Sequence, residues 1–359
     1  MTKKPLPERV YRPFMVQDLE SKMVFIGGPR QVGKTTLAQS FLEQGGSDPA
    51  YFNWDNEIHR KTINQMDWPK DQPLIILDEI HKRKNWQNFV KGAWDTWKKK
   101  QNFIVTGSAR LNVFRKGGDS MLGRYHYYCI HPYSLPELGI NAENLRALFK
   151  FGGFPEPLLM QDETELRRWH LQRVSKLVRI DLRDLEKVND LDKVELLAEE
   201  LPNRVGSQLS YKSLSEDLGV SDKTVKMWVQ ILDSLYYCFR ILPYGPPKVR
   251  AVKKTQKLYL WDWSEVEEEG ARFENMIASH LLKWCHFTRD WGYEDLDLFY
   301  IRDKEKREVD FLITKKKKPW ILIEVKLSDD KAPKTLKHFA QQLQVEHCFL
   351  VLKNLKSPG

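Results

Sequence analysis

The stretch MVFIGGPRQVGKTTLAQSFLEQ, residues 23–44, places an apolar run, a glycine-rich turn and an amphipathic segment in succession. The run from Met23 to Ile26 has the composition of a buried strand, and the pattern Gly-x-x-x-x-Gly-Lys-Thr follows it at residues 28–35. Glycines at these positions let backbone N–H groups close around phosphate groups, and the N-terminus of the following helix adds partial positive charge. The stretch therefore predicts an α/β domain with a parallel sheet and a phosphate site where its first strand ends.

The residues of this turn are candidates for binding ATP together with Mg²⁺. They are Gly28, Gly33, Lys34, Thr35 and Thr36. In a turn of this kind the Lys34 ammonium group reaches the β- and γ-phosphates, and the Thr35 hydroxyl group coordinates Mg²⁺.

A second apolar run ends in two carboxylates. The stretch PLIILDEIH, residues 73–81, reads as a parallel strand covered on both faces, with Asp78 and Glu79 at its C-terminal end. Ligands of open α/β sheets bind at that end of the strands. We expect Asp78 to hold Mg²⁺ through water and Glu79 to polarise the water that attacks the γ-phosphate.

A third run, NFIVTGSAR at residues 102–110, ends in hydroxyl groups. We expect one of them to sense the γ-phosphate and favour Ser108 slightly over Thr106; the alternative is a strand end that is only capped. Arg110 and Arg124 are candidates for stabilising transition-state charge, in cis or from a neighbouring subunit, although each is also typical of a surface arginine.

Five segments, taken in order, resemble those of the archaeal-type AAA+ ATPases, a broad prokaryotic group of P-loop ATPases. They are GGPRQVGKTTL, LIILDEIHK, FIVTGSARL, LGRYHYYCIHPYSLPEL and FGGFPEPLL. The resemblance covers nearly the whole chain. It implies an AAA+ ATPase core, a helical lid, a role associated with DNA and, as members often carry one, a C-terminal restriction-endonuclease-like domain. It implies no single established reaction.

Four zones follow from changes in pattern along the chain. We expect residues 1–140 to form the AAA+ ATPase domain, residues 141–200 a helical lid, residues 201–264 a winged helix-turn-helix and residues 265–359 the restriction-endonuclease-like domain. The expected fold class is α/β, with a P-loop parallel-sheet domain first and an αβββαβ unit last.

The segment SYKSLSEDLGVSDKTVKMWVQILDSLYY, residues 210–237, has the pattern of a helix-turn-helix. Gly219 permits the turn, and Ser221 is a good N-cap for the second helix. That helix is expected to expose Lys223 and Lys226, which are side chains of the kind that contact DNA. The alternative is a winged helix that serves only to pack against protein.

The stretch EVDFLITKKKKPWILIEVK, residues 308–326, reads as two strands around a basic turn and holds charged residues inside both strands. Alternation along a strand places Glu324 and Lys326 on one face and can bring Asp310 beside Glu324. Two carboxylates in a sheet repel each other unless a cation joins them. Mg²⁺ binds such oxygen sites and can generate a nucleophile from water.

The helix expected at residues 271–284 directs Glu274 toward the core side, where a third carboxylate fits a metal site. The predicted order of elements is then αβββαβ. The resemblance assigns Asp310, Glu324 and Lys326 to catalysis and Glu274, Asp310 and Glu324 to metal binding. The alternative is a structural Asp–Lys–Glu network in a catalytically inactive domain.

Charge and composition indicate the partners of the 359-residue chain. Its formal net charge is +9, and residues 301–359 carry 14 Lys and Arg against 8 Asp and Glu, which favours DNA as a partner. No apolar run is long enough to span a membrane, and the N-terminal segment lacks the apolar region of a secretory signal. The four cysteines show no Cys-x-x-Cys spacing, which is typical of reduced thiols in a cytoplasmic protein.

Together these patterns predict a cytoplasmic ATPase that uses ATP and Mg²⁺, binds DNA and carries a Mg²⁺-dependent nuclease domain, with a role in genome maintenance or defence. The alternative is a nucleotide-switched protein that hydrolyses ATP and docks DNA or another protein while its nuclease-like domain is inactive. We expect no membrane partner and leave a homo-oligomer open.

Overall fold

The computed structural model describes residues 7–42, 50–107, 121, 123–181, 190–245, 256–328, 331 and 333–354. The chain divides into two compact units, Met1–Leu138 and Gly139–Gly359. Ser108 and Arg110 lie outside the described residues, so the roles predicted for them stay predictions.

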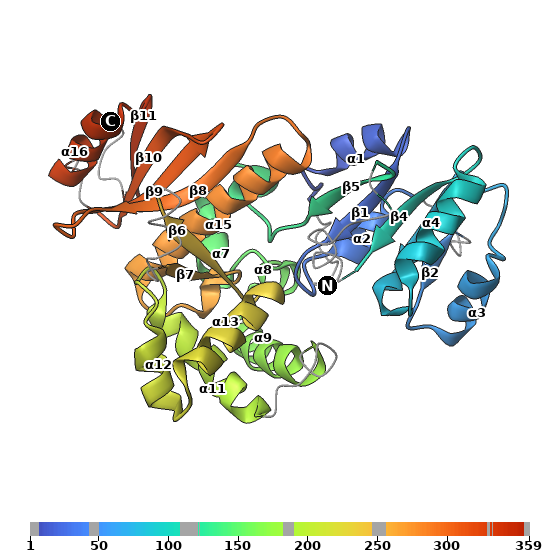
Figure 1. Ribbon diagram of the computed structural model, residues 1–359, viewed down its shortest axis with the longest axis horizontal. Helices are drawn as coiled ribbons and strands as arrows, with labels where there is room; N and C mark the ends of the chain where they lie inside the picture. The colour runs from blue at the N-terminus through green and yellow to red at the C-terminus, as the bar shows by residue number, and fades with distance from the viewer. Residues whose placement is uncertain are drawn as a thin grey trace. The chain divides into compact units, whose positions relative to one another are not determined.

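The first unit is built on a five-stranded sheet in which every strand pair is parallel (Figure 1). Across the sheet the strands are β2 (Tyr51–Asn53), β3 (Leu74–Asp78), β4 (Asn102–Thr106), β1 (Met23–Gly27) and β5 (Tyr125–Cys129). The side chains of β1, β3 and β4 are almost all buried, as expected for parallel strands covered on both faces. The three apolar runs of the sequence therefore form three adjacent strands.

Helices flank this sheet, and the phosphate-binding turn joins β1 to the second of them. The helices are α1 (Arg12–Leu19), α2 (Lys34–Gln39), α3 (Glu57–Gln65), η1 (Ile80–Lys82), α4 (Trp86–Trp97) and α6 (Leu135–Leu138). Gly33 is the N-cap of α2 with φ +95°. Gly28 has φ +130°, and a Cβ atom there would lie 2.4 Å from the carbonyl oxygen of Ile130, so only glycine fits without distortion.

The second unit begins with helices. They are α7 (Ala142–Phe151), α8 (Pro155–Met160), α9 (Glu163–Lys176), η3 (Leu177–Asp181), α11 (Leu191–Glu200), η4 (Leu201–Arg204), α12 (Tyr211–Leu218) and α13 (Asp222–Ser234). The segment expected to form a lid, residues 141–200, thus lies in this unit. Here Trp169 Nε1 donates a 2.9 Å hydrogen bond to Asp262, and Arg173 forms an ion pair with Glu265.

A six-stranded sheet completes the second unit (Figure 1). Its strands, in spatial order, are β11 (His347–Leu352), β10 (Lys318–Lys326), β9 (Glu308–Lys315), β8 (Leu296–Arg302), β6 (Cys238–Pro243) and β7 (Lys257–Leu260). The remaining helices are η5 (Trp263–Glu265), α15 (Glu269–Asp290) and α16 (Lys334–Leu343). Strands β8, β9 and β10 are antiparallel neighbours, and β11 is parallel to β10.

The elements predicted for residues 271–352 are therefore present in the order α15–β8–β9–β10–α16–β11. The strands expected to form a wing, β6 and β7, extend the same sheet, because Leu242 and Pro243 of β6 pair with Phe299 and Tyr300 of β8. A continuous sheet thus crosses the predicted boundary at residues 264 and 265. The domain limits inside this unit stay predictions.

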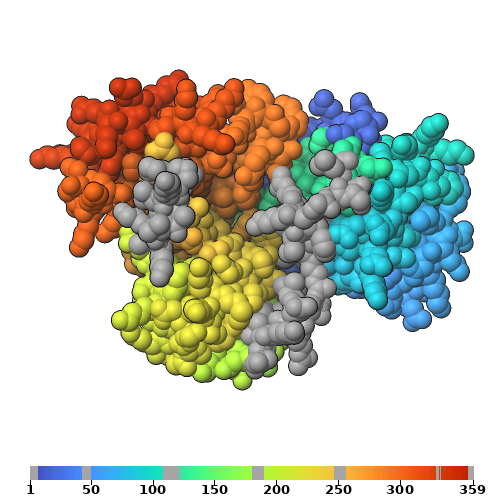
Figure 2. All heavy atoms as spheres, in the orientation of Figure 1, coloured from blue at the N-terminus to red at the C-terminus, as the bar shows by residue number. Residues whose placement is uncertain are grey.

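Helices α12 and α13 have the local features expected of the predicted turn between them. Gly219 has φ +62°, and Ser221 Oγ accepts a 3.2 Å hydrogen bond from the Thr224 amide. Lys223 and Lys226 are exposed on α13, which lies at the surface drawn in yellow in Figure 2. Within the described segments, no helix is both long and apolar enough to cross a membrane.

Candidate functional site

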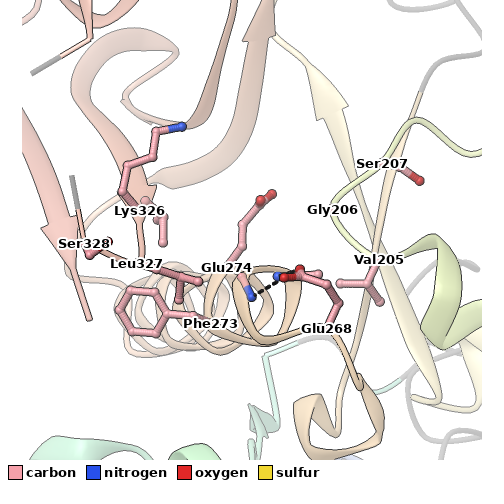
Figure 3. A pocket seen from close by; sticks show the side chains of 12 residues that line it. Val205, Gly206, Ser207, Glu268, Phe273, Glu274, Lys326, Leu327 and Ser328 are labelled. Atoms are coloured by element: carbon pink, nitrogen blue, oxygen red, sulfur yellow. Dashed lines mark hydrogen bonds between the residues drawn. The ribbon is translucent and has the colours of Figure 1, made fainter. Parts of the chain in front are cut away.

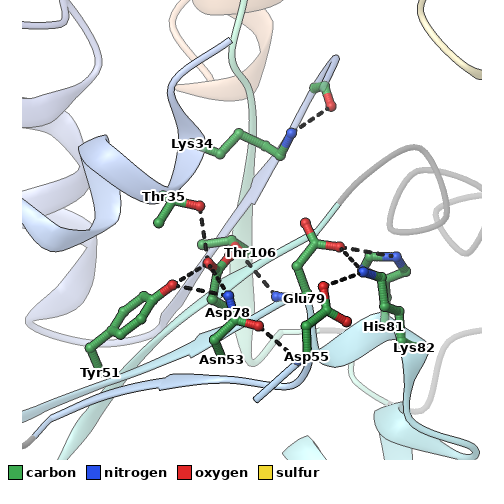
Figure 4. Close-up of polar contacts among 11 residues, drawn as sticks. Lys34, Thr35, Tyr51, Asn53, Asp55, Asp78, Glu79, His81, Lys82 and Thr106 are labelled. Carbon is green, nitrogen blue, oxygen red and sulfur yellow. Dashed lines mark hydrogen bonds and ion pairs between the residues drawn. The ribbon is translucent and has the colours of Figure 1, made fainter. Parts of the chain in front are cut away.

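The glycine-rich turn holds Lys34 at the start of α2 with its ammonium group directed back at the turn (Figure 4). Lys34 Nζ donates hydrogen bonds to the carbonyl oxygens of Gly28 at 3.1 Å and Pro29 at 2.7 Å. Burial lowers the pKa of Lys34 to about 8, although the nearby carboxylates of Glu79 and Asp78 oppose that shift. The ammonium group is thus poorly solvated and suited to an anionic ligand.

The carboxylate of Asp78, at the C-terminal end of β3, accepts hydrogen bonds from hydroxyl groups of three neighbouring segments (Figure 4). Its Oδ2 atom accepts hydrogen bonds from Thr35 Oγ1 at 3.0 Å and from the Tyr51 hydroxyl group at 2.5 Å, and its Oδ1 atom accepts one from Thr106 Oγ1. Asn53 Nδ2 lies 3.4 Å from Oδ2. Parallel strands that end at one edge of the sheet bring these side chains together.

Glu79 follows β3 in the left-handed region, with φ +56°, which is uncommon for a residue other than glycine. Its carboxylate lies 3.2 Å from Lys82 Nζ and 3.8 Å from His81 Nε2. Lys82 also pairs with Asp55 at 2.6 Å. The strained backbone turns Glu79 out of the strand, where it is partly exposed.

Several residues of this site were not singled out by the sequence analysis. Tyr51 and Asn53 belong to β2, a strand of three residues that the sequence pattern did not predict. Burial, together with the hydrogen bond to Asp78, raises the pKa of Tyr51. Arg9 Nη2 donates a 2.6 Å hydrogen bond to the carbonyl oxygen of Val32 in the glycine-rich turn. Thr106, which the sequence analysis favoured slightly less than Ser108, is one of the three described hydroxyl groups that donate to Asp78. In the sequence, the one feature that could have indicated Tyr51 and Asn53 is that polar side chains end a short strand.

The second candidate site lies in the sheet of the second unit, where Lys257 of β7 meets three carboxylates. Its Nζ atom lies 3.2 Å from Glu274 of α15, 2.7 Å from Glu308 and 3.5 Å from Asp310 of β9. Burial alone would lower the pKa of Lys257, but the carboxylates outweigh burial and raise it. Lys257 is 2% exposed, so the charges of these acids are compensated within the protein.

Asp310, Glu324 and Lys326 are brought together on β9 and β10. Asp310 Oδ2 accepts a 2.9 Å hydrogen bond from the Val325 amide, and Lys326 Nζ lies 2.8 Å from Glu324 Oε1. Burial and the nearby Asp310 raise the pKa of Glu324. Burial and Asp310 also raise the pKa of Glu274, to about 7, against the opposing effect of Lys257.

The oxygen atoms of this cluster suit a hard divalent ion such as Mg²⁺. Glu324 Oε2 is buried and has no hydrogen-bond partner in the described part of the chain, which leaves one acceptor available for a cation. A cavity of about 550 Å³ adjoins the cluster, and Glu274 and Lys326 line it (Figure 3). In the described residues, the ligand atoms of Glu274, Asp310 and Glu324 do not all lie within 4.8 Å of one another, so sharing one ion would require these side chains to move closer together. Lys257 is an additional cation in this cluster that the sequence did not indicate.

In comparisons with known proteins, residues 20–139 match the family model described as AAA domain. Residues 142–264 match a Domain of unknown function (DUF8612), and residues 269–358 match a second one (DUF4143). The AAA match agrees with the parallel sheet and the glycine-rich turn. It supports an ATPase that binds nucleotide in the first unit.

Similar chains include two from Methanocaldococcus jannaschii. "Uncharacterized protein MJ1637" is 24% identical over 96% of this chain and 83% of its own length, and "Uncharacterized protein MJ1544" is 23% identical over 93% and 82%.

Two solved structures also match, with low TM-scores. The Aeropyrum pernix ORC1 protein in complex with DNA aligns with TM-score 0.37 and 15% identity over 77% of this chain and 95% of that one. The Signal Transduction ATPase with Numerous Domains (STAND) protein with a tetratricopeptide repeat sensor, PH0952, from Pyrococcus horikoshii aligns with TM-score 0.31 and 14% identity over 81% and 48%.

Binding of a non-hydrolysable ATP analogue is expected to weaken as pH rises from about 7 to about 9.5. Lys34, with a pKa of about 8, is charged at the lower pH and neutral at the higher one, so the affinity should fall by roughly tenfold or more. Titration calorimetry across this interval measures the change. The Lys34→Met variant should bind weakly with a much flatter pH profile, and equal wild-type affinity at both ends would contradict the assignment.

Proposed function

We propose that the chain is an ATP-hydrolysing AAA protein that binds DNA and carries a Mg²⁺-dependent nuclease-like centre in its second unit. The observation that carries the ATPase assignment is the Asp78 carboxylate, which accepts hydrogen bonds from Thr35 of the phosphate-binding turn and from Thr106 at the end of β4. This arrangement joins the phosphate-binding turn to the acid that follows the second apolar run.

Each residue of the first site has a defined task in this proposal. Lys34 exchanges its two carbonyl partners for the β- and γ-phosphates. Thr35 and Asp78 would hold Mg²⁺, which would neutralise phosphate charge. Glu79 orients a water molecule and accepts its proton as the water oxygen bonds to the γ-phosphorus and the bond to the bridging oxygen of ADP breaks. Gly28, Gly33 and Thr36 contribute the turn and the first turn of α2. Ser108 remains a candidate γ-phosphate sensor.

DNA binding is proposed from the charge and from α13. Lys223 and Lys226 are both exposed on α13. A turn that contains Gly219 joins α12 to this helix. Such a helix can enter a groove or contact phosphates, and lysines contribute mainly by neutralising phosphate charge.

The nuclease proposal rests on the convergence of Asp310, Glu324 and Lys326, with Glu274 nearby. The carboxylates would hold Mg²⁺, which activates water and stabilises phosphate charge when bound. Asp310 is oriented by the Val325 amide, and Lys326 is positioned beside Glu324 to orient the attacking water or a phosphate oxygen.

A second candidate function is favoured by one observation, the burial of Lys257 among three of the acids. A cluster compensated in this way is stable without a metal ion. The chain would then be a nucleotide-switched ATPase that docks DNA or a protein, and residues 265–359 would serve as a binding or structural domain.

The Lys34→Ala variant is expected to lose tight ATP binding because the cation that meets the phosphates is gone. Glu79→Gln should keep ATP binding and lower kcat by roughly 10²- to 10⁴-fold, since the general base is lost. Steady-state ATPase assays and nucleotide-binding measurements test both. Matched controls are Lys61→Ala and Glu57→Gln, which alter an exposed ion pair on α3. Wild-type ATPase rates in both site variants would contradict the assignment.

DNA affinity is expected to fall steeply with salt because bound lysines release counterions. Lys223→Glu with Lys226→Glu should weaken binding and reduce the slope of log K against log salt by about 2. Fluorescence anisotropy on duplex and single-stranded DNA measures this. The control is Lys193→Glu with Lys212→Glu, the same charge change on α11 and α12. Equal losses in both double variants would place the DNA contact elsewhere.

Asp310→Asn and Lys326→Ala are each expected to abolish Mg²⁺- or Mn²⁺-dependent DNA cleavage and to leave ATP hydrolysis unchanged. Asparagine is preferred at residue 310 because it can still accept the hydrogen bond from the Val325 amide. A nuclease assay on several DNA structures, with and without ATP, provides the measurement, with Glu305→Ala as the exposed control. Cleavage that persists in Asp310→Asn places the chemistry on other residues. A wild type that never cleaves favours the second candidate.

A further inference from the structure

The acidic cluster of the second unit is built around a cation that belongs to the chain itself. We propose that the Lys257 ammonium group is its resident counter-ion, which holds Glu274, Glu308 and Asp310 in place before a divalent ion binds and competes with that ion for the same carboxylates. The competition rests on the proposed metal centre, whereas the counter-ion role does not. Lys257 is thus a positioning residue.

The backbone around Lys257 fixes where its side chain can reach. Lys257 pairs with Ile241 of β6 on one side and forms a bridge with Gln208 on the other. Tyr259, two residues further along β7, donates a 2.7 Å hydrogen bond to Glu274 Oε1, the same atom that lies 3.2 Å from Lys257 Nζ. Residues two apart on a strand share a face, so β7 presents both donors to α15.

The loop before α12 closes over this arrangement. Gly206 has φ +72°, and a Cβ atom there would lie 3.2 Å from both carboxylate oxygens of Glu274. Glu274 therefore has the loop, Tyr259 and Lys257 as neighbours and is open on the side of the cavity that it lines.

The charges of the cluster come close to balance but do not reach it. Within the described residues, the carboxylates are Glu274, Glu308, Asp310 and Glu324, and the cations in ion pairs with them are Lys257, Lys326 and Arg302. With every group ionised the cluster carries one net negative charge. Lys257 is the cation shared by three of the acids, so its removal leaves the largest uncompensated repulsion, and a divalent ion would overcompensate while Lys257 remains.

The counter-ion role is tested in EDTA, without any metal. Lys257→Met should lower the melting temperature of the full-length protein, because a methionine of similar length leaves the buried carboxylates unpaired. Adding Glu274→Gln to Lys257→Met should recover a large part of the loss, since one repelling charge is removed and Tyr259 keeps its acceptor. The matched pair is Lys315→Met with and without Glu294→Gln, an ion pair of the same sheet that is less buried.

Recovery in the Lys257 series and none in the Lys315 series supports the counter-ion role. A double variant no more stable than Lys257→Met would overturn it. If Lys257→Met does not fold in EDTA, the same comparison is made by asking whether the double variant does fold, by circular dichroism.

The competition is tested with Mn²⁺ alone, by calorimetry and by the rise in melting temperature on adding the ion. Lys257→Met should bind Mn²⁺ roughly tenfold or more tightly than the wild type, because a positive charge close to the ligands is gone. Lys257→Arg keeps the charge and should retain the weaker affinity. Unchanged or weaker Mn²⁺ binding by Lys257→Met would overturn the competition.

The counter-ion role of Lys257 and its competition with a divalent ion are contradicted by different results. If neither the wild type nor Lys257→Met responds to Mn²⁺, the cluster does not bind this ion. Both the metal centre of the proposed function and the competition are then wrong. The EDTA comparison still decides the counter-ion role, because it contains no metal.

Discussion

One buried ammonium group, that of Lys257, holds together parts of the second unit that are distant in sequence. It joins β7 to α15 and to β9 through three carboxylates within 3.5 Å. Breaking a buried ion pair by removing one partner typically costs about 3 to 5 kcal/mol, because the other charge is left without compensation. Here one cation serves three acids, so β7, the helix and the sheet depend on each other. These ion pairs add to the backbone pairing of β6 with β8 that makes β6 and β7 part of the same sheet as β8 to β11.

In the site of the first unit, a buried carboxylate is stabilised by neutral hydrogen-bond donors and not by a cation. Asp78 is 2% exposed, and its two oxygen atoms accept hydrogen bonds from the hydroxyl groups of Thr35, Tyr51 and Thr106. Hydroxyl groups can also accept, so Thr35 can turn its oxygen to a metal ion without moving its backbone. An ammonium group can only donate. The hydroxyl groups around Asp78 can therefore turn to other partners, whereas Lys257 keeps a positive charge among the acids of the second site.

The acidic cluster is also connected to the helices at the start of the second unit. Trp169 and Arg173 of α9 contact Asp262 and Glu265, which lie just before α15. Glu268 then caps α15 by accepting hydrogen bonds from the Gly270 and Ala271 amides, as the dashed lines of Figure 3 show. Since α15 carries Glu274, the position of this carboxylate depends on packing that begins in residues 163–176.

The sequence by itself determined the features that depend on local spacing. The glycine-rich turn requires glycine at positions 28 and 33 because of their positive φ, and the apolar runs ending in Asp78 and Thr106 became adjacent parallel strands. Strand alternation likewise placed Lys326 beside Glu324. Only the tertiary structure decided which donors surround Asp78 and which cation compensates Glu308 and Asp310. Lys257 lies more than fifty residues before Asp310 in the chain, and no periodicity links them. Charge compensation acts through space, so it follows from strand order and burial, which the local pattern does not contain.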